Sequence, residues 1–155
     1  MKSCFSALNS TGISGADRIA FLDAIIFNFL MGNGDAHGKN YSILYAENGP
    51  SLAPLYDLMS TIAYVKFAPK HKMAMRIAGN SYLFSRTSRE SFSKLSEISG
   101  FKSSFILKHL DSIASVICQA ARRLAEQLQS DKTTESPIYS KIIDIIERHV
   151  QSVAN

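Results

Sequence analysis

The sequence predicts a mainly α-helical protein with a small β insert, an α+β fold. Apolar residues recur at helical spacing over residues 16–31 and again over residues 103–129. Alternation typical of short strands occurs between them, most clearly over residues 41–53. The chain has 155 residues, of which 46% are hydrophobic and 19% charged, a composition typical of folded rather than disordered proteins. We therefore expect one domain over residues 1–155.

The first predicted helix covers residues 16–31. Ser14 followed by Asp17 resembles a capping box at its start. Residues 24–30 are apolar on nearly every side of a helix, which predicts that most of its surface is buried. Gly32 comes just past the last turn, where glycine commonly ends a helix.

The β insert follows this helix. Residues 41–45 alternate like a short strand, residues 47–50 predict a turn, and residues 51–53 predict the returning strand. Residues 61–66 fit a strand or a helix equally well. Residues 72–77 alternate in the manner of a strand, although the signal is weak.

A helical bundle is predicted over residues 87–154. Thr87 and Glu90 fit a capping box for a helix that Gly100 ends.

The long helix over residues 103–129 carries an apolar stripe that we interpret as core packing. Ser136 and Pro137 predict the start of a last helix, with serine as the cap and proline at the first position. The stripe of the long helix consists of Ile106, Leu110, Ile113, Ile117, Ala120, Leu124 and Leu128.

Charge and composition indicate the cellular compartment of the protein more clearly than its function. The net charge of +4 favours anionic partners without selecting one. The apolar stretches are too short to cross a bilayer and the N-terminus has no signal-peptide core, so we expect a cytoplasmic protein without a membrane partner. Cys4 and Cys118 match no metal or redox spacing, and we expect reduced thiols.

Residues of chemical interest concentrate in the loop over residues 32–40. This loop holds three glycines, one carboxylate, one imidazole, one ammonium and two carboxamides directly after the buried helix. Asp35 and Asn40 provide oxygen donors five residues apart. Asp57 follows at some distance among apolar neighbours that we expect to half-bury it, and a half-buried carboxylate needs a partner such as a cation.

Phosphoryl transfer from ATP uses this set of groups. One carboxylate accepts the proton of the attacking hydroxyl, while an asparagine and a second aspartate hold Mg²⁺ against phosphate oxygens. Asp35, Asn40 and Asp57 reproduce the order and the five-residue offset found in protein kinases. The same residues also fit structural roles: Asp35 in a turn, Asn40 at a strand start, and Asp57 as a helix cap.

Two segments resemble the catalytic and metal loops of the HipA family of serine/threonine kinases, the toxins of bacterial toxin–antitoxin pairs. These segments are residues 27–42 and 52–61, and residues 73–79 and the capped helix from Ser88 are also similar to that family. The resemblance covers roughly residues 14–130. It implies the helical C-lobe of a protein kinase, with the catalytic and metal loops in residues 32–61.

The resemblance also implies roles for single residues. Asp35 would be the catalytic base, and Asn40 and Asp57 the ligands of Mg²⁺. His37 taken alone also fits a surface histidine, and Lys39 a solvated lysine. The ATP contacts that the family implies fall on His37, Gly38, Lys39, Asn40, Tyr56 and Asp57, the first three of these at the phosphates.

The chain departs from the family in two ways. Gly34 stands where a threonine-like residue is common, which we expect to loosen the loop. HipA proteins are also much longer, and their phosphate-binding loop, strand lysine and adenine-contacting segment precede the matched region. The resemblance therefore implies a C-lobe without an N-lobe, which alone would bind Mg²⁺-ATP weakly or not at all and would be inactive.

Three functional hypotheses follow. The chain could be part of a split or truncated HipA-like kinase, completed by an N-lobe polypeptide and acting on a protein substrate. It could be a non-catalytic remnant that binds a partner such as a helix-turn-helix antitoxin, and reaches DNA only through it. The third is a basic domain that binds nucleic acid, or a metal-dependent hydrolase that uses Asp35, His37 and Asp57.

Overall fold

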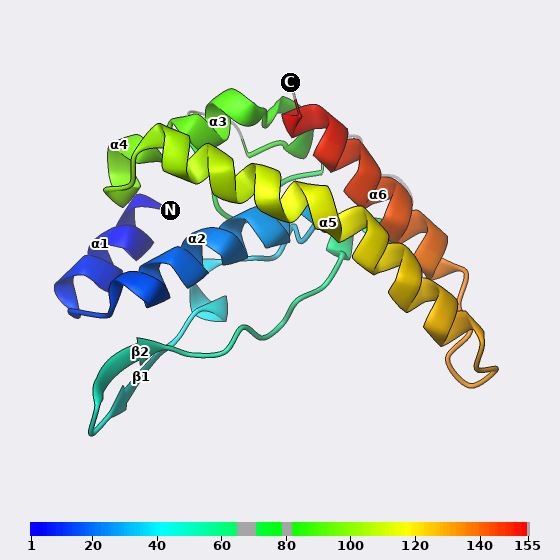
Figure 1. Cartoon of the computed structure of the whole chain (residues 1–155), viewed down its shortest axis with the longest axis horizontal. Coiled ribbons are helices and arrows are strands. Elements are labelled where there is room, and N and C mark those ends of the chain that lie inside the picture. Colours follow the sequence, from blue (N-terminus) through cyan, green and yellow to red (C-terminus); the bar gives the residue numbers. More distant parts are fainter. Residues whose placement is uncertain (65–70, 79–81, 155) are drawn as a thin grey trace.

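The structure is a computed structural model that describes residues 1–64, 71–78 and 82–154. Three helices form its framework, and the long α5 crosses α2 while α6 returns beside α5 (Figure 1). The prediction of a mainly helical α+β fold is confirmed. The framework helices are α2 (Gly15–Leu30), α5 (Ser103–Gln129) and α6 (Ile138–Val153); the shorter helices are α1 (Lys2–Ser10), α3 (Arg89–Ser93) and α4 (Ser96–Ser99).

Helix α2 is the centre of the core, and it begins and ends one residue earlier than predicted. The Ser14 hydroxyl accepts a hydrogen bond from the backbone N–H of Asp17 at 3.1 Å, so the predicted cap is present. Gly32 ends the helix with φ +76°. A Cβ at Gly32 would lie 2.7 Å from Ile62 and 2.8 Å from Ile145. The large side chains of α2 that are fully buried are Phe21, Leu22, Ile26 and Leu30.

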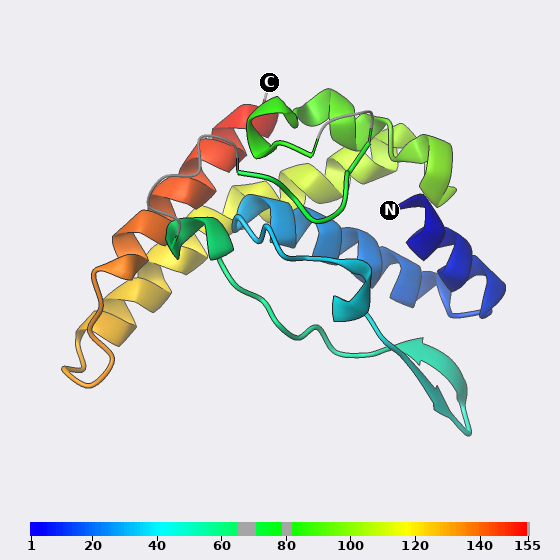
Figure 2. The same ribbon diagram turned by 180° about the vertical axis from the view of Figure 1, so that it is seen from behind.

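The β insert is a hairpin that extends away from the helices (Figures 1 and 2). Strand β1 (Ile43–Ala46) pairs antiparallel with β2 (Gly49–Leu52), and Ala46 faces Gly49 across a turn shorter than predicted. The Asp17 carboxylate accepts a hydrogen bond from the N–H of Leu52 at 3.0 Å, which fastens the hairpin to α2. Hydrogen bonds from Ser14 and Leu52 lower the pKa of Asp17 below its ordinary value.

The segments after the hairpin are less regular than predicted. Residues 61–64 form a 3₁₀ helix, η2 (Thr61–Tyr64), while residues 65 and 66 lie outside the described residues. The strand predicted over residues 72–77 is wrong, because the described part of this segment makes a single β-bridge, from Lys72 to Leu83. Its backbone bonds are divided between two partners, Tyr82 and Gly34, so a regular ladder cannot form.

Helix α1 was not predicted. It spans only nine residues and has no side-chain cap, so its sequence signal is weak. Phe5 and Leu8 are buried, and the Phe5 and Phe21 rings form a T-shaped pair with their centroids 5.1 Å apart. Tertiary packing therefore holds this helix.

The helix predicted after Thr87 is divided into α3 and α4, and its cap lies one residue later. Ser88 is the cap, and its N–H donates to the Ser91 hydroxyl at 3.2 Å. Thr87 instead donates its hydroxyl to the carbonyl of Leu83 at 3.1 Å. Gly100 ends α4 with φ +77°, as predicted.

The apolar stripe of α5 belongs to the core only as far as Ile117. Ile106, Leu110 and Ile117 are buried, whereas Leu124 is 56% exposed. The second half of α5 extends beyond the end of α2 (Figure 1), so α2 cannot cover it. An open apolar groove of about 350 Å³ lies there between α5 and α6. Helix α6 begins at Ile138, one residue later than predicted, with proline at the cap.

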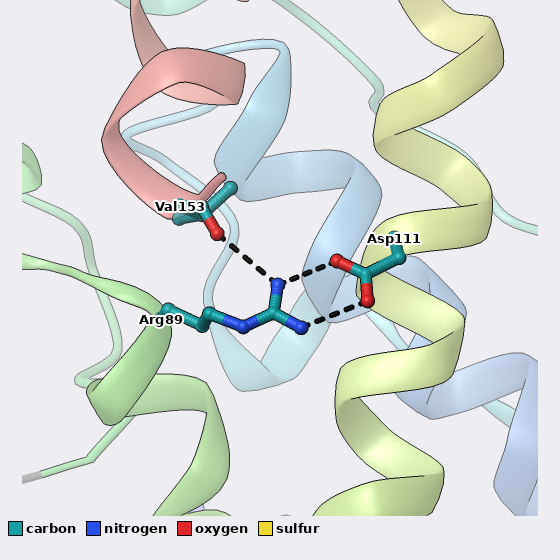
Figure 3. A network of polar contacts seen from close by, with 3 residues as sticks. All are labelled: Arg89, Asp111 and Val153. Carbon is teal, nitrogen blue, oxygen red and sulfur yellow. Dashed lines mark hydrogen bonds and ion pairs between the residues drawn. The ribbon is translucent and has the colours of Figure 1, made fainter. Parts of the chain in front are cut away.

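A bidentate ion pair joins α3 to α5 beside the C-terminal end of α6 (Figure 3). Arg89 donates to both carboxylate oxygens of Asp111 at 2.5 and 2.8 Å, and to the carbonyl of Val153 at 3.3 Å. The two side chains are 28% and 56% exposed, so the pair stabilises the fold by only about 0.2–1 kcal/mol. The hydrogen bond from Arg89 lowers the pKa of Asp111, so this stabilisation is lost as the pH falls through that lowered pKa.

Both cysteines are free and half-buried, as expected of reduced thiols. Burial raises the pKa of the Cys118 thiol. None of the helices within the described ranges is both long and apolar enough to cross a bilayer.

Candidate metal and phosphate site

The candidate loop leaves the end of α2 and closes in a 3₁₀ turn, η1 (Gly38–Asn40). The N–H of His37 donates to the carbonyl of Asp35 at 2.7 Å, and the N–H of Asn40 donates to the carbonyl of His37 at 3.0 Å. In this loop Asp35 is exposed and Asn40 is buried. The Asp35 carboxylate makes no hydrogen bond or ion pair within the described part of the chain.

Asn40 and Asp57 come together although 17 residues separate them. The Asn40 amide nitrogen donates to a carboxylate oxygen of Asp57 at 2.5 Å. Asn40 is only 5% exposed, and its carbonyl oxygen is buried with no partner among the residues that the structure describes. A buried oxygen without a donor is costly unless something else, such as a cation, satisfies it.

Asn40 and Asp57 suit Mg²⁺, which needs few protein ligands, better than a metal ion that requires three or more protein ligands. No cluster of three or more His, Cys, Asp or Glu side chains that could hold a metal occurs in the described ranges. Mg²⁺ accepts one or two protein oxygens and completes its shell with water and phosphate oxygens. The carboxylate of Asp57 and the unpaired oxygen of Asn40 therefore fit the ion that the sequence predicts.

Asp57 is not half-buried as expected but exposed. The apolar residues beside it do not cover it, because the segment from residue 53 to 59 runs along the surface without helix or strand. Tyr56 and Leu58 on either side are themselves 44% and 39% exposed. The backbone of Asp57 is left-handed, with φ +56°, and it is the only described residue besides glycine with a positive φ.

Sequence reasoning missed Asn33, which lies at the centre of the site. Asn33 is 3% exposed. Its amide nitrogen donates to the side chain of Asn28 at 2.8 Å and to the backbone carbonyl of Asp57 at 3.1 Å. Its side-chain oxygen accepts from the N–H of Asp35 at 3.1 Å. No role is assigned to Asn33 from the sequence, because no local pattern predicts that this asparagine is buried.

Gly34 does not loosen the loop, contrary to the expectation. Its N–H donates to the Thr61 hydroxyl at 2.7 Å, and its carbonyl accepts from the N–H of Ala74 at 2.8 Å. A Cβ at this position would lie 2.8 Å from the carbonyl oxygen of Lys72. The loop is therefore held on both sides, and the absent side chain permits the close approach of the neighbouring segment.

The remaining candidates surround this centre. The Tyr56 hydroxyl donates to the carbonyl of Lys39 at 2.7 Å and lies 2.9 Å from the Ser42 hydroxyl, so it joins the two loops. The His37 ring nitrogen Nδ1 is buried and has no partner among the described residues. Gly38 and the Lys39 side chain are exposed. The structure thus pairs Asn40 with Asp57 and Lys39 with Tyr56, and links Asp35 to Asp57 through Asn33.

Comparisons with known proteins agree with this architecture. The family model of the HipA-like C-terminal domain matches residues 1–149. The candidate kinase Y4mE of Sinorhizobium fredii is 38% identical over 126 residues, which cover 81% of this chain and 29% of that protein. The serine/threonine-protein kinase toxin HipA of Shewanella oneidensis is 46% identical over 50 residues, which cover 32% of this chain and 12% of that protein.

A solved structure gives the same result in three dimensions. It is the complex of HipA, HipB and operator DNA from Shewanella oneidensis, and its matching chain has a TM-score of 0.73 at 26% identity. The match covers 86% of this chain and 30% of that chain, so this chain spans about a third of the length of the relatives it matches. From the family match and the shared fold, the chain belongs to the HipA-like C-terminal domain family, a kinase-related family.

Proposed function

We propose that this chain is the catalytic and metal-loop region of a cytoplasmic HipA-type serine/threonine protein kinase of a toxin–antitoxin system. The reaction is transfer of a phosphoryl group from Mg²⁺-ATP to the hydroxyl of a protein substrate. The observation that carries the proposal is the contact of Asn40 with Asp57, with the Asn40 oxygen unpaired, at the end of a loop that also presents the free carboxylate of Asp35.

The proposed roles follow from where each group lies. Asp35 is exposed and unpaired, which suits a base that accepts the proton of the substrate hydroxyl. Asn40 and Asp57 would hold Mg²⁺, which would neutralise charge on the phosphate oxygens of ATP.

The residues beside the metal ligands would bind the nucleotide. His37, Gly38 and Lys39 would face its phosphates, and Tyr56 would contact the nucleotide. We propose that the rest of the ATP site would lie in a region of the relatives outside the third that this chain matches. We therefore expect this chain alone to bind ATP weakly and to need an N-lobe for transfer.

The metal site can be tested on the chain alone. We expect Mg²⁺ to shift the NMR signals of the Asn40 and Asp57 amides in a saturable manner. Asp57→Asn should weaken this binding at least tenfold, because it removes the only carboxylate of the pair. Asp144→Asn makes the same charge change on an exposed part of α6, and should leave the affinity within twofold of the wild type. Equal weakening by both variants would mean that Mg²⁺ only follows net charge.

A helix-turn-helix antitoxin is the partner that we propose, and the protein would reach DNA only through it. The solved relative contains HipA together with HipB and operator DNA. We expect a purified antitoxin of this type to bind the chain equally well when Asp35→Asn and Asp57→Asn are combined, because neither carboxylate is proposed to serve that contact. Calorimetric titration would measure the affinity. Loss of antitoxin binding in the double variant would contradict a separate partner surface.

A further inference from the structure

We infer that Asn33 is a positioning residue that holds the backbone of the base, Asp35, and the backbone of the metal ligand, Asp57, in one fixed arrangement. The inference rests on the proposed function and deepens it. Asn33 would not touch substrate or metal itself. Its buried carboxamide bonds to both loops: the oxygen accepts from the N–H of Asp35, and the nitrogen donates to the carbonyl of Asp57.

The first half of this arrangement concerns Asp35. The side-chain oxygen of Asn33 accepts from the N–H of Asp35 at 3.1 Å, two residues along the chain. The Asp35 side chain has no partner of its own within the described residues. The hydrogen bond from the Asp35 N–H to Asn33 therefore fixes the backbone position of Asp35, which carries the unpaired carboxylate.

The second half concerns Asp57. Its left-handed backbone, with φ +56°, is unfavourable for any residue other than glycine, although aspartate tolerates it better than most. Such a conformation persists only where the surroundings hold it. The amide nitrogen of Asn33, in the other loop, donates to the backbone carbonyl of Asp57 at 3.1 Å.

Asn28 fixes the orientation of the Asn33 carboxamide. The side-chain oxygen of Asn28 accepts from Asn33 at 2.8 Å, which requires that the nitrogen of Asn33 point inward. The amide nitrogen of Asn28 in turn donates to the carbonyl of Ala24 at 2.9 Å and lies 3.2 Å from the Tyr41 hydroxyl. A chain of hydrogen bonds thus runs from the buried end of α2 to both candidate loops.

The chemistry of this position is demanding. Ionised aspartate at position 33 has nearly the same shape as asparagine but cannot donate, so Asn33→Asp at a pH where the carboxyl is ionised would keep the bond to Asp35 and lose the bonds to Asp57 and Asn28. Leucine fills a similar volume and makes none of these bonds. The two substitutions therefore separate the two loops.

The test uses the full chain, labelled with ¹⁵N, first without metal. We expect Asn33→Leu to shift the amide signals of both Asp35 and Asp57 and to lower their heteronuclear NOE values, and Asn33→Asp to do so mainly at Asp57. Thr87→Val is the matched control, since Thr87 is also buried and hydrogen-bonded but lies outside the site. The control should leave both amides unchanged even where it lowers the stability to urea.

A second readout is the affinity for Mg²⁺. Residues that orient a metal ligand typically change the affinity 10–100-fold when they are replaced. We expect Asn33→Leu and Asn33→Asp to weaken Mg²⁺ binding about tenfold or more, and Thr87→Val to change it less than twofold.

The outcomes distinguish this inference from the proposed function. If wild-type protein does not bind Mg²⁺ through Asp57, the proposed function fails, and the metal-free spectra alone decide the role of Asn33. If Asn33→Leu leaves the amides of Asp35 and Asp57 as they are in the wild type, or binds Mg²⁺ equally well, the inference is overturned. Should Asn33→Leu fail to fold, Asn33→Asp gives the same decision at Asp57.

Discussion

Replacing Asp35 with asparagine is expected to slow phosphoryl transfer about 10²–10⁴-fold, the usual contribution of a general base. Asparagine has the same shape but cannot accept the proton of the substrate hydroxyl. The measurement is single-turnover transfer from labelled ATP to a protein substrate. It requires a completed enzyme, made by placing this chain in the matching region of the Shewanella oneidensis HipA toxin, with which it shares the fold.

Two controls accompany this experiment. Asp144→Asn in the same chimera should transfer phosphate at the unaltered rate, since Asp144 lies on the exposed face of α6. Asp35→Asn should also leave the Mg²⁺ affinity unchanged, because Asp35 is not proposed to be a metal ligand. A variant that keeps the wild-type rate would remove Asp35 from the mechanism.

The largest effect on stability is expected at Gly32, where an added methyl group meets two obstacles. The left-handed backbone costs about 1–2 kcal/mol for a residue with a Cβ. That Cβ would also lie 2.7 Å from Ile62 and 2.8 Å from Ile145, and overpacking of this kind costs about 1–3 kcal/mol. Gly32→Ala should therefore lower the free energy of unfolding, measured with urea, by about 2–5 kcal/mol in total.

Gly12 is a matched control for this substitution. It also has a positive φ, +69°, but a Cβ there would meet nothing within 4 Å. Gly12→Ala should thus cost only the backbone part, about 1–2 kcal/mol. Equal losses at Gly12 and Gly32 would show that the side chains around Gly32 yield without cost.

The sequence predicts the framework well because long helices carry redundant signals. Helix α2 has a capping serine, an apolar stretch and a terminal glycine, and all three act in the structure as expected. Helix α5 is long enough that its bounds follow from periodicity alone. Short elements lack this redundancy, so α1 was missed and the cap of α3 was misplaced by one residue.

The candidate site was predicted in part. The five-residue offset in the loop and the aspartate beyond the hairpin identified the residue pair that the fold brings into contact. Exposure of Asp57 could not be foreseen, because apolar neighbours in sequence do not cover a residue in an extended surface segment. The role of Asn33 depends on partners in separate segments, Asn28 and Asp57, and no local pattern reports contacts of that kind.

The backbone at residue 57 also limits which amino acids evolution can place there. A left-handed conformation is readily accepted by glycine, asparagine and aspartate, whereas an anionic oxygen is offered only by aspartate and glutamate. Aspartate alone belongs to both groups. Glutamate, although it preserves the charge, would have to adopt a torsion that its longer side chain disfavours, so a change that is conservative in most alignments would be a severe one here.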